Sequence, residues 1–414
     1  MKKYILIIGD GMADNPVPEL GNRTPLQAAE KPYIDALAAK AQVGSVLTVP
    51  PTMPPGSDTA ILSIFGCDPC RYFTGRSPLE AAGCGVKVEA GCASFRCNMI
   101  NLEEGDMPFN EKRIFSHNAG SIEGDVSMAV IRALCEDPEF RKALMELGIT
   151  IYPTPSFRHM TLQKNGDIDK IVMKPPHDIL GKKIGDYAFS GNDNAKKLWG
   201  LMELANQKLE HLPLNEERRA QGKKPANGIW FWAEGTAVEL PDFVKTYGHG
   251  GSVISAVPLV HGIGVLTGLK MIEVEGATGE VDTNYAGKLQ AAKDALLAGD
   301  EFLCVHLEAP DEATHNGSLS DKLLAIHQLD SLIVEPLTKW MEEQKMDYRL
   351  LMLSDHKTLM SSRTHDGDPV PYLIYDSTAP ANCGRTYCEV SGEQGPYIEK
   401  GTQLMSLLFE KLTV

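Results

Sequence analysis

Three apolar segments of this sequence, each about the length of a β-strand, end in side chains that can bind a metal ion. The segments span residues 4–8, 302–307 and 348–353, and the acidic and imidazole side chains that follow them are Asp10, Asp311, His315, Asp355, His356 and His365. In an open parallel sheet, ligands bind at the carboxyl ends of the strands. We therefore expect three aspartates and three histidines to face one crevice.

The spacing of these residues is compatible with metal coordination. Asp311 and His315 lie four positions apart, which places both on one face of a helix. Asp355 and His356 are neighbours, so both can reach one ion only where the strand has ended. Carboxylate and imidazole ligands suit Mn²⁺ or Zn²⁺, and Mg²⁺ where oxygens dominate. Each pair alone would favour a salt bridge or a helix cap, but together they indicate a two-metal site for phosphoryl transfer.

Ser57 is the candidate nucleophile. It follows a proline-rich loop and precedes an apolar segment at residues 58–65, so we predict that Ser57 is the N-cap of a helix. The N-terminus of a helix offers backbone N–H groups and a positive dipole end, which would stabilise a phosphate carried on Ser57. Coordination of the serine oxygen by a metal ion would activate it without a strong base. The alternative is that Ser57 is an ordinary capping serine.

The composition limits the class of protein and its partners. The 414 residues carry a formal charge of −15, and a surface of that sign repels the phosphates of nucleic acids. Nine cysteines without a recognisable secretion signal argue against a disulfide scaffold. No apolar segment approaches the roughly 20 residues of a membrane-spanning helix. We therefore expect a cytoplasmic protein that binds a small ligand and neither nucleic acid nor membrane.

The order of the expected strands and helices predicts an α/β fold. Strands expected at residues 4–8, 44–49, 229–232, 253–257, 302–307, 348–353 and 370–375 alternate with helices expected at 32–41, 261–269, 283–298, 321–343 and 402–412. This alternation is typical of a doubly wound, mainly parallel sheet. Residues 88–188 instead combine strands of alternating polarity with one long amphipathic helix at 126–147. We therefore predict a core domain of residues 1–87 and 189–414 and an inserted α+β domain of residues 88–188.

A set of basic residues could bind an anionic substrate. Arg76, Arg96 and Arg158 provide guanidinium groups, which suit bidentate contacts with phosphate and carboxylate. His159 follows Arg158 directly, and the pair His177-Asp178 could transfer a proton. The alternative for each of these residues is an exposed side chain or a loop turn. Because the sequence has no G-x-x-x-x-G-K-[ST] motif, the usual nucleotide-binding loop is missing.

Several short motifs, in order from about residue 4 to about residue 410, resemble those of the archaeal-type 2,3-bisphosphoglycerate-independent phosphoglycerate mutases, a family of the alkaline phosphatase superfamily. The motifs are Gly9-Asp10-Gly11, Pro55-Gly56-Ser57-Asp58-Thr59-Ala60, Thr74-Gly75-Arg76-Ser77-Pro78-Leu79-Glu80-Ala81, Gly276-Ala277-Thr278-Gly279, Asp311-Glu312-Ala313-Thr314-His315, Ser354-Asp355-His356 and His365-Asp366-Gly367-Asp368-Pro369-Val370-Pro371. The resemblance implies an alkaline-phosphatase-like fold and the interconversion of 3-phosphoglycerate and 2-phosphoglycerate.

The resemblance also implies roles for individual residues. Ser57 would take the phosphoryl group as phosphoserine and return it to the other hydroxyl of glycerate. One divalent ion (Mn²⁺, Zn²⁺ or Mg²⁺) would be bound by Asp311, His315 and His365, and a second by Asp10, Asp355, His356 and Ser57. The inserted domain would close over a small phosphorylated hydroxy acid, and no 2,3-bisphosphoglycerate would be needed. Lys245 is a candidate for the lysine that assists the nucleophile in related mutases.

One motif departs from the family pattern. The better-known mutases have the order Asp-Pro-His in the inserted domain, whereas this sequence has Pro175-Pro176-His177-Asp178. The variant is similar to a branch of the family proposed to phosphorylate homoserine. Phosphoglycerate mutase is the expected activity, and a homoserine kinase-like phosphotransferase of threonine biosynthesis is the alternative. A simple phosphomonoesterase and a non-catalytic metal-binding protein are the remaining interpretations.

Overall fold

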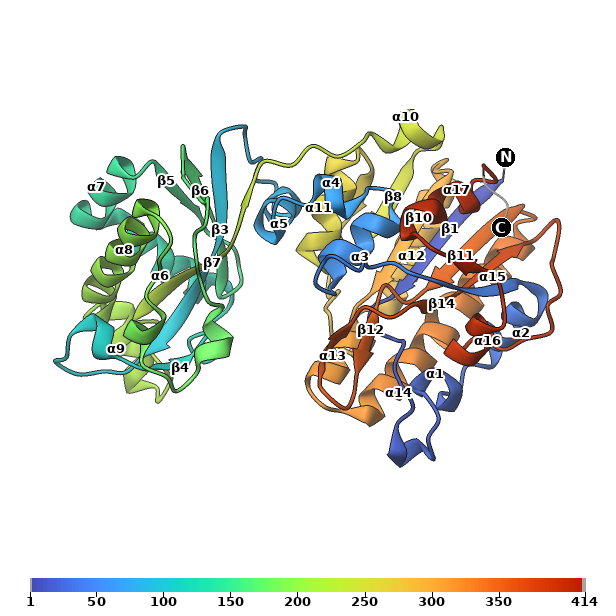
Figure 1. Ribbon diagram of the computed structural model, residues 1–414, viewed down its shortest axis with the longest axis horizontal. Helices are drawn as coiled ribbons and strands as arrows, with labels where there is room; N and C mark the ends of the chain where they lie inside the picture. Colours follow the sequence, from blue (N-terminus) through green and yellow to red (C-terminus); the bar gives the residue numbers. More distant parts are fainter. Residues whose placement is uncertain (1, 412–414) are drawn as a thin grey trace. The chain divides into compact units, whose positions relative to one another are not determined.

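The computed structural model describes residues 2–411 of the chain, and the chain divides into two compact units. Met1–Phe73 and Glu239–Val414 form unit 1, and Thr74–Val238 forms unit 2 (Figure 1). Unit 2 is therefore an insertion between two parts of unit 1. Within the described residues, no helix is both long enough and apolar enough to cross a membrane.

Unit 1 is built on an eight-stranded, mainly parallel sheet. Its strands lie in the order β15 (Tyr397–Ile398), β2 (Gln42–Val46), β14 (Val370–Asp376), β11 (Tyr348–Leu353), β1 (Lys3–Gly9), β10 (Phe302–Leu307), β8 (Gly251–Ile254) and β9 (Lys270–Ile272). β14 runs antiparallel to β2 and β11, and the other neighbouring strands are parallel. The predicted doubly wound, mainly parallel α/β fold is thus confirmed.

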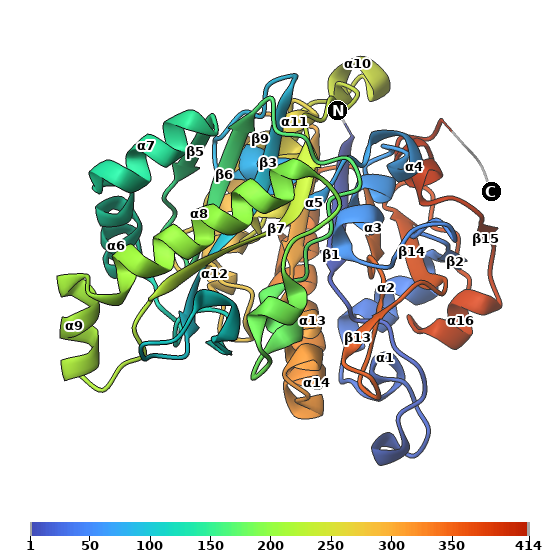
Figure 2. The same cartoon turned by 60° about the vertical axis from the view of Figure 1, so that its left-hand side comes forward.

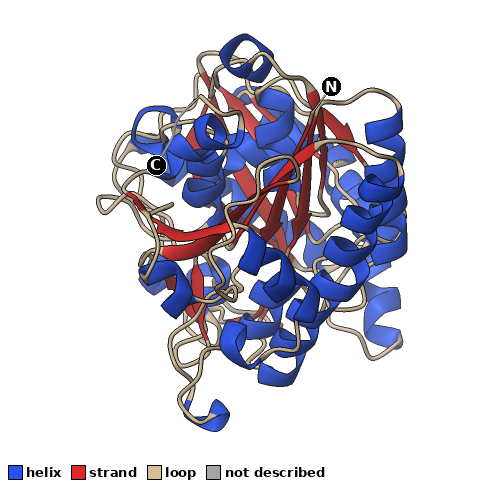
Figure 3. Ribbon diagram, turned by 90° about the vertical axis from the view of Figure 1, so that its right-hand side faces the viewer, coloured by secondary structure: helices blue, strands red, loops and turns tan. Residues whose placement is uncertain are grey.

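Helices cover both faces of this sheet (Figure 3). One layer contains α2 (Pro32–Lys40), α12 (Tyr285–Leu297) and α15 (Glu335–Glu343), and the other contains α3 (Ser57–Ile64), α11 (Pro258–Leu266) and α17 (Leu404–Leu408). Because both faces are covered, β1, β10 and β11 are buried almost throughout, which explains why their sequences are apolar without alternation. The helix predicted at 402–412 is α17, and residue 412 lies outside the described residues.

Unit 2 contains an antiparallel sheet with helices on one face. β3 (Cys92–Leu102) pairs with β4 (Ile114–Ser116), β6 (Arg158–Lys164) and β7 (Gly228–Thr236), and β5 (Ile149–Tyr152) pairs with β6. Figure 2 shows α6 (Gly124–Glu136), α7 (Pro138–Glu146) and α8 (Asp193–Glu210) along one face of this sheet. Apolar side chains of these helices and of β3 form one hydrophobic core, so the unit has a core of its own.

The helix predicted at 126–147 is in fact two helices. Asp137 accepts hydrogen bonds from the backbone N–H groups of Glu139 and Phe140, both at 3.0 Å, and so caps a new helix. That helix, α7, begins at Pro138, a residue that suits the first helical position because it has no N–H to satisfy. The Asp-Pro pair therefore separates α6 from α7.

The strand predicted at 229–232 belongs to unit 2 and not to the parallel sheet. It is part of β7, which pairs with β3 in antiparallel register. Because β7 pairs with β3 and α8 packs on β7, unit 2 extends to Val238, and because α5 (Arg76–Gly83) packs on β3 and β7, it begins at Thr74. Both boundaries lie outside the insertion predicted at residues 88–188.

Candidate active site

The carboxyl ends of the adjacent strands β11, β1 and β10 bring the predicted acidic side chains together. Asp10 follows β1, and its backbone N–H donates to the carbonyl of Leu307, the last residue of β10, at 2.9 Å. Asp355 and His356 follow β11 closely, and α13 (Ala309–His315), which follows β10, carries Asp311. The parallel sheet therefore places residues from both ends of the chain at one edge.

These side chains form two groups, each of which offers three ligand atoms within 4.8 Å of one another. The inner group consists of Asp10, Asp355 and His356, and the outer group consists of Asp311, His315 and His365. His365 lies in the hairpin of β12 (Lys357–Leu359) and β13 (Thr364–Asp366), directly opposite Thr358. The Thr358 hydroxyl donates to Asp311 Oδ1 at 2.6 Å and lies 3.1 Å from His356 Nδ1. Thr358 thus connects the two groups.

Ser57 lies beside the inner group. Its Oγ donates to Asp10 Oδ2 at 3.2 Å and lies 3.1 Å from His356 Nε2. The predicted capping role is wrong, because Gly56 is the N-cap of α3 and Ser57 is its first residue. The hydroxyl of Ser57 contacts Asp10 and His356 instead of capping the helix. Its backbone N–H lies at the positive end of the helix.

Buried negative charge dominates the inner group. Burial, and then the negative charges of Asp355, Asp311 and Glu308, raise the pKa of Asp10 well above its usual range. Asp355 is fully buried, and its Oδ2 has no hydrogen-bond partner among the described residues. A buried polar atom without a partner costs about 1–3 kcal/mol, and more when it is charged. The inner group therefore fits a divalent cation, which would give this oxygen a partner and offset the negative charge.

Contacts between histidine and carboxylate dominate the outer group. Burial alone would raise the pKa of Asp311, but hydrogen bonds from His315 and His365 outweigh it and hold that pKa well below its usual range. The contact with Asp311, at 3.1 Å, raises the pKa of His315 to about 9. His315 Nδ1 donates to the carbonyl of Arg363 at 2.9 Å, and its Nε2 lies 3.0 Å from His365 Nε2. The oriented Nε2 atoms and the carboxylate suit a second cation.

Three further buried residues support these groups. His306 Nε2 lies 3.1 Å from Asp10 Oδ2, and burial lowers the pKa of His306 to about 3. Lys288 donates to the carbonyl of His306 at 3.4 Å, and Lys322 donates to the carbonyl of Thr358 at 2.6 Å. None of the three was predicted from the sequence, because each lies within an apolar or helical segment without a recognisable motif.

Unit 2 gathers basic side chains around Trp232 of β7. The guanidinium carbons of Arg96 and Arg158 lie 4.5 Å and 5.7 Å from the centre of the Trp232 ring, within the range of cation–π contacts. The ring of His177 lies 5.2 Å from the same ring. Trp232 Nε1 donates to Asn98 Oδ1 at 2.9 Å, which fixes the indole. The resulting basic cluster, in which Arg96 is buried and His177 is exposed, suits a small anion with a carboxylate or a phosphate.

Glu80 of α5 is the acidic partner of this basic cluster. It pairs with Arg76 at 2.9 Å and more closely with Arg96. Burial alone would raise the pKa of Glu80, but Arg96 and Arg76 outweigh it and hold that pKa below its usual range. Neither Glu80 nor Trp232 was predicted as a site residue. The spacing of four residues from Arg76 was a signal for Glu80, whereas Trp232 is found only once β7 is known to pair with β3.

Two of the predicted residues, His159 and Lys245, lie apart from these clusters, and Asp178 makes only a long contact with His177. His159 faces away from its neighbour Arg158, accepts the N–H of Thr154 at 3.1 Å, and has a pKa that burial lowers to about 4. Asp178 is half-exposed, and its Oδ1 lies 3.7 Å from His177 Nε2, too far for a hydrogen bond. Lys245 is exposed on α10 (Phe243–Tyr247), which packs at the amino end of β10. The structure thus does not bring His159 or Lys245 to the site.

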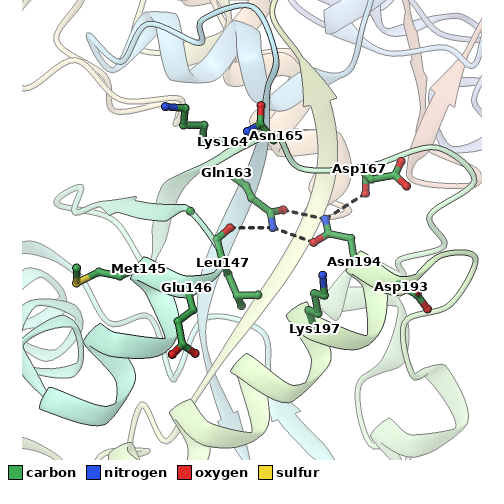
Figure 4. Close-up of a pocket in the computed structure, with 11 residues that line it drawn as sticks. Met145, Glu146, Leu147, Gln163, Lys164, Asn165, Asp167, Asp193, Asn194 and Lys197 are labelled. Carbon is green, nitrogen blue, oxygen red and sulfur yellow. Dashed lines mark hydrogen bonds between the residues drawn. The ribbon is translucent and has the colours of Figure 1, made fainter.

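A cavity of about 460 Å³ in unit 2 is lined by none of these residues. Figure 4 shows the carboxamides of Gln163 and Asn194 in its wall, where each donates to the oxygen of the other at 2.8 Å. Their remaining N–H groups donate to the carbonyls of Leu147 at 3.3 Å and Asp167 at 3.1 Å. Because all four amide hydrogens have partners within the protein, the pair serves to join β6 to α8.

Known proteins resemble this chain over nearly its whole length. Residues 38–215 match the family model described as 2,3-bisphosphoglycerate-independent phosphoglycerate mutase. A protein of that name from Methanosarcina acetivorans is 44% identical over 385 residues, which cover 93% of each chain. Another of the same name, from Methanothrix thermoacetophila, is 42% identical over 98% of this chain and 99% of the relative.

Two solved structures are also similar. A protein from Pyrococcus horikoshii gives a TM-score of 0.78 at 27% identity, and the match covers 100% of this chain and 99% of the other. A cofactor-independent phosphoglycerate mutase from Thermoplasma acidophilum gives a TM-score of 0.63 at 25% identity, covering 99% of this chain and all of the other. The similarity therefore includes both units.

Replacing Glu80 with Gln should destabilise the protein, because Arg96 would stay buried without its negative partner. The two side chains are only 6% and 4% exposed, and removing one member of a buried ion pair costs about 3–5 kcal/mol. Denaturant unfolding would measure the loss. The control is Glu89→Gln, which changes an exposed glutamate and should alter the free energy of unfolding by no more than about 0.5 kcal/mol. Equal stability of the two variants would contradict the role of Glu80.

Proposed function

The chain belongs to the family of 2,3-bisphosphoglycerate-independent phosphoglycerate mutases, and we propose that it interconverts 3-phosphoglycerate and 2-phosphoglycerate through a phosphoserine at Ser57. The observation that carries this proposal is the position of the Ser57 hydroxyl, 3.2 Å from Asp10 Oδ2 and 3.1 Å from His356 Nε2. A hydroxyl beside two potential metal ligands, at the N-terminus of a helix, is the arrangement that a phosphoryl-accepting serine requires.

Two divalent ions, Mn²⁺, Zn²⁺ or Mg²⁺, complete the proposed site. The outer group of Asp311, His315 and His365 would hold one ion, and the inner group of Asp10, Asp355 and His356, with Ser57, would hold the other. The lack of a hydrogen bond at Asp355 Oδ2 and the raised pKa of Asp10 support a cation at the inner group. Bound divalent ions would supply positive charge that stabilises the transferring phosphoryl group.

The proposed reaction consists of two phosphoryl transfers, the first to Ser57 and the second back to glycerate, so that Ser57 is regenerated. Ser57 Oγ forms a bond to the phosphorus of 3-phosphoglycerate while the bond from phosphorus to O3 breaks, and the hydroxyl proton passes to O3. The 2-hydroxyl of glycerate then displaces Ser57 Oγ from phosphorus, and the proton of that hydroxyl returns to Ser57. Asp10 and His356 orient Ser57 Oγ in both steps, and the N–H groups at the start of α3 stabilise the phosphate.

Unit 2 is proposed to recognise the substrate, a small phosphorylated hydroxy acid. Arg96 and Arg158, with Arg76 beside Glu80, offer planar guanidinium groups to its carboxylate or phosphate. His177 lies against the indole of Trp232, which Arg96 and Arg158 also contact, and Asp178 follows His177 in the chain. His159 is left out of this set, because it points to the other face of the sheet. Such an activity would place the protein in glycolysis or gluconeogenesis in the cytoplasm.

Ser57→Ala should abolish the proposed mutase activity while the protein stays folded. With Mn²⁺ present, formation of 2-phosphoglycerate from 3-phosphoglycerate can be followed by coupling to enolase. Loss of the nucleophile should lower turnover by more than about 1,000-fold. The matched control is Ser63→Ala, which changes another buried serine of α3 that packs beside Gly401.

Three outcomes of this experiment would overturn the assignment. Turnover by Ser57→Ala at the wild-type rate would remove Ser57 as the nucleophile. Absence of mutase activity in the wild-type protein, together with ATP-dependent phosphorylation of homoserine, would change the acceptor. Release of inorganic phosphate in place of isomerisation would make the protein a phosphomonoesterase.

The affinity of the outer group for Mn²⁺ should rise with pH up to about 9. Without metal, the pKa of His315 is raised to about 9 by Asp311, so at neutral pH a metal ion must displace a proton from His315. One displaced proton makes the affinity fall about tenfold for each pH unit below that pKa. Titration calorimetry from pH 6.5 to 9.5, in buffers of different ionisation enthalpy, would measure the affinity and the released proton. An affinity that stays constant over this range would contradict coordination by His315.

A further inference from the structure

A row of three buried polar side chains crosses the unit 1 sheet and ends at the inner group. Ser255 follows β8, His306 is in β10, and Asp10 follows β1, and these strands are neighbours in the order β8, β10, β1. The strand register explains this row. Val305 is opposite Ile254, so Ser255 comes next to His306. His306 is opposite Ile8, and Asp10 follows two residues later at the same edge of the sheet. The exposed fractions of Ser255, His306 and Asp10 are 2%, 0% and 2%, so solvent does not compete for their hydrogen bonds.

Hydrogen bonds along the row run in one direction. The backbone N–H of Val257 donates to Ser255 Oγ at 3.0 Å, which leaves the hydroxyl hydrogen of Ser255 free to point elsewhere. His306 Nδ1 lies 3.0 Å from Ser255 Oγ and is placed to accept that hydrogen. In that tautomer His306 carries its own hydrogen on Nε2, which lies 3.1 Å from Asp10 Oδ2 and would donate to it. Ser255 thus determines which nitrogen of His306 faces Asp10 as a donor.

A neutral donor has a specific effect on Asp10. It holds Oδ2 in place but leaves the negative charge of the carboxylate intact, whereas a lysine or arginine would cancel that charge. The other oxygen, Oδ1, lies 3.5 Å from His356 Nε2, on the side of the inner group. In metal sites, groups that hydrogen-bond to a ligand from outside orient it and tune its basicity.

We propose that His306, oriented by Ser255, is a positioning residue that holds the Asp10 carboxylate for a divalent cation at the inner group. This inference rests on the proposed metal site, to which His306 itself contributes no ligand. It predicts an effect on one of two metal-binding events only, because no residue of the outer group contacts His306 through a hydrogen bond in the described structure.

Titration calorimetry of the metal-free protein with Mn²⁺ tests this role. In His306→Leu, which removes the donor, one of the two binding events should weaken by about 10–100-fold, and the other should keep its wild-type affinity. In His306→Gln, whose side-chain amide can restore an N–H near the position of Nε2, the weakened affinity should recover to within about threefold of the wild-type value.

A matched control is available in the same sheet. His249 also contacts a carboxylate, Glu301, at 2.6 Å, but this pair precedes β8 and β10 at their amino ends, away from both metal groups. His249→Leu should therefore leave both Mn²⁺ affinities unchanged. Circular dichroism of each variant separates an effect on metal binding from a loss of fold.

Unchanged Mn²⁺ affinities in a folded His306→Leu variant would overturn the proposal, as would equal losses in the Leu and Gln variants. If His306→Leu does not fold, Ser255→Ala tests the proposal instead. This variant keeps the imidazole but removes the hydroxyl that determines which ring nitrogen carries the hydrogen. A loss of about threefold or more in the same binding event is then expected, and no loss would overturn the role. These affinities do not depend on the reaction catalysed, so a wild-type protein that binds two Mn²⁺ ions without mutase activity would refute only the proposed function.

Discussion

Buried negative charge at one edge of the unit 1 sheet is the constraint on which the rest of the site depends. Asp10, Asp355 and Asp311 lie at the carboxyl ends of adjacent strands or just beyond them, and all three are at most 5% exposed. Burial and mutual repulsion raise the pKa of Asp10, and one oxygen of Asp355 has no hydrogen-bond partner among the described residues. Unless Asp10 is protonated, such an arrangement costs free energy that nearby positive charge would offset, so a site suited to cations explains the cluster.

The surrounding structure keeps these carboxylates in fixed positions. Thr358 connects the outer group to the inner group, His315 is oriented by the carbonyl of Arg363, and His306 contacts Asp10 from the neighbouring strand. His306 lies in β10 of the sheet itself, whereas Thr358 and Arg363 belong to the hairpin of β12 and β13 that follows β11. Ser57 enters the same cluster from the first turn of α3, so its hydroxyl is oriented before any substrate binds.

Much of this cluster of aspartates and histidines could be predicted from sequence, because it depends on where strands end. The apolar segments 302–307 and 348–353 have the bounds of β10 and β11, and the polar residues after them meet at one edge. Residues whose place depends on strand pairing could not be found in this way. The apolar segment at 229–232 would suit either sheet, and only its pairing with β3 assigns it to unit 2 and sets Trp232 beside Arg96. Likewise, His306 lies in an apolar strand, so its contact with Asp10 could not be predicted from the sequence.

The positions of bound metal ions test the central claim most directly. Crystals of the wild-type protein grown with Mn²⁺ can be measured at the manganese absorption edge, where anomalous scattering locates each ion independently of any assay. Two peaks are expected, one in contact with Asp10, Asp355 and His356 and one in contact with Asp311, His315 and His365. Peaks that lie elsewhere, or no peak at either group under conditions in which the enzyme is active, would contradict a two-metal centre beside Ser57.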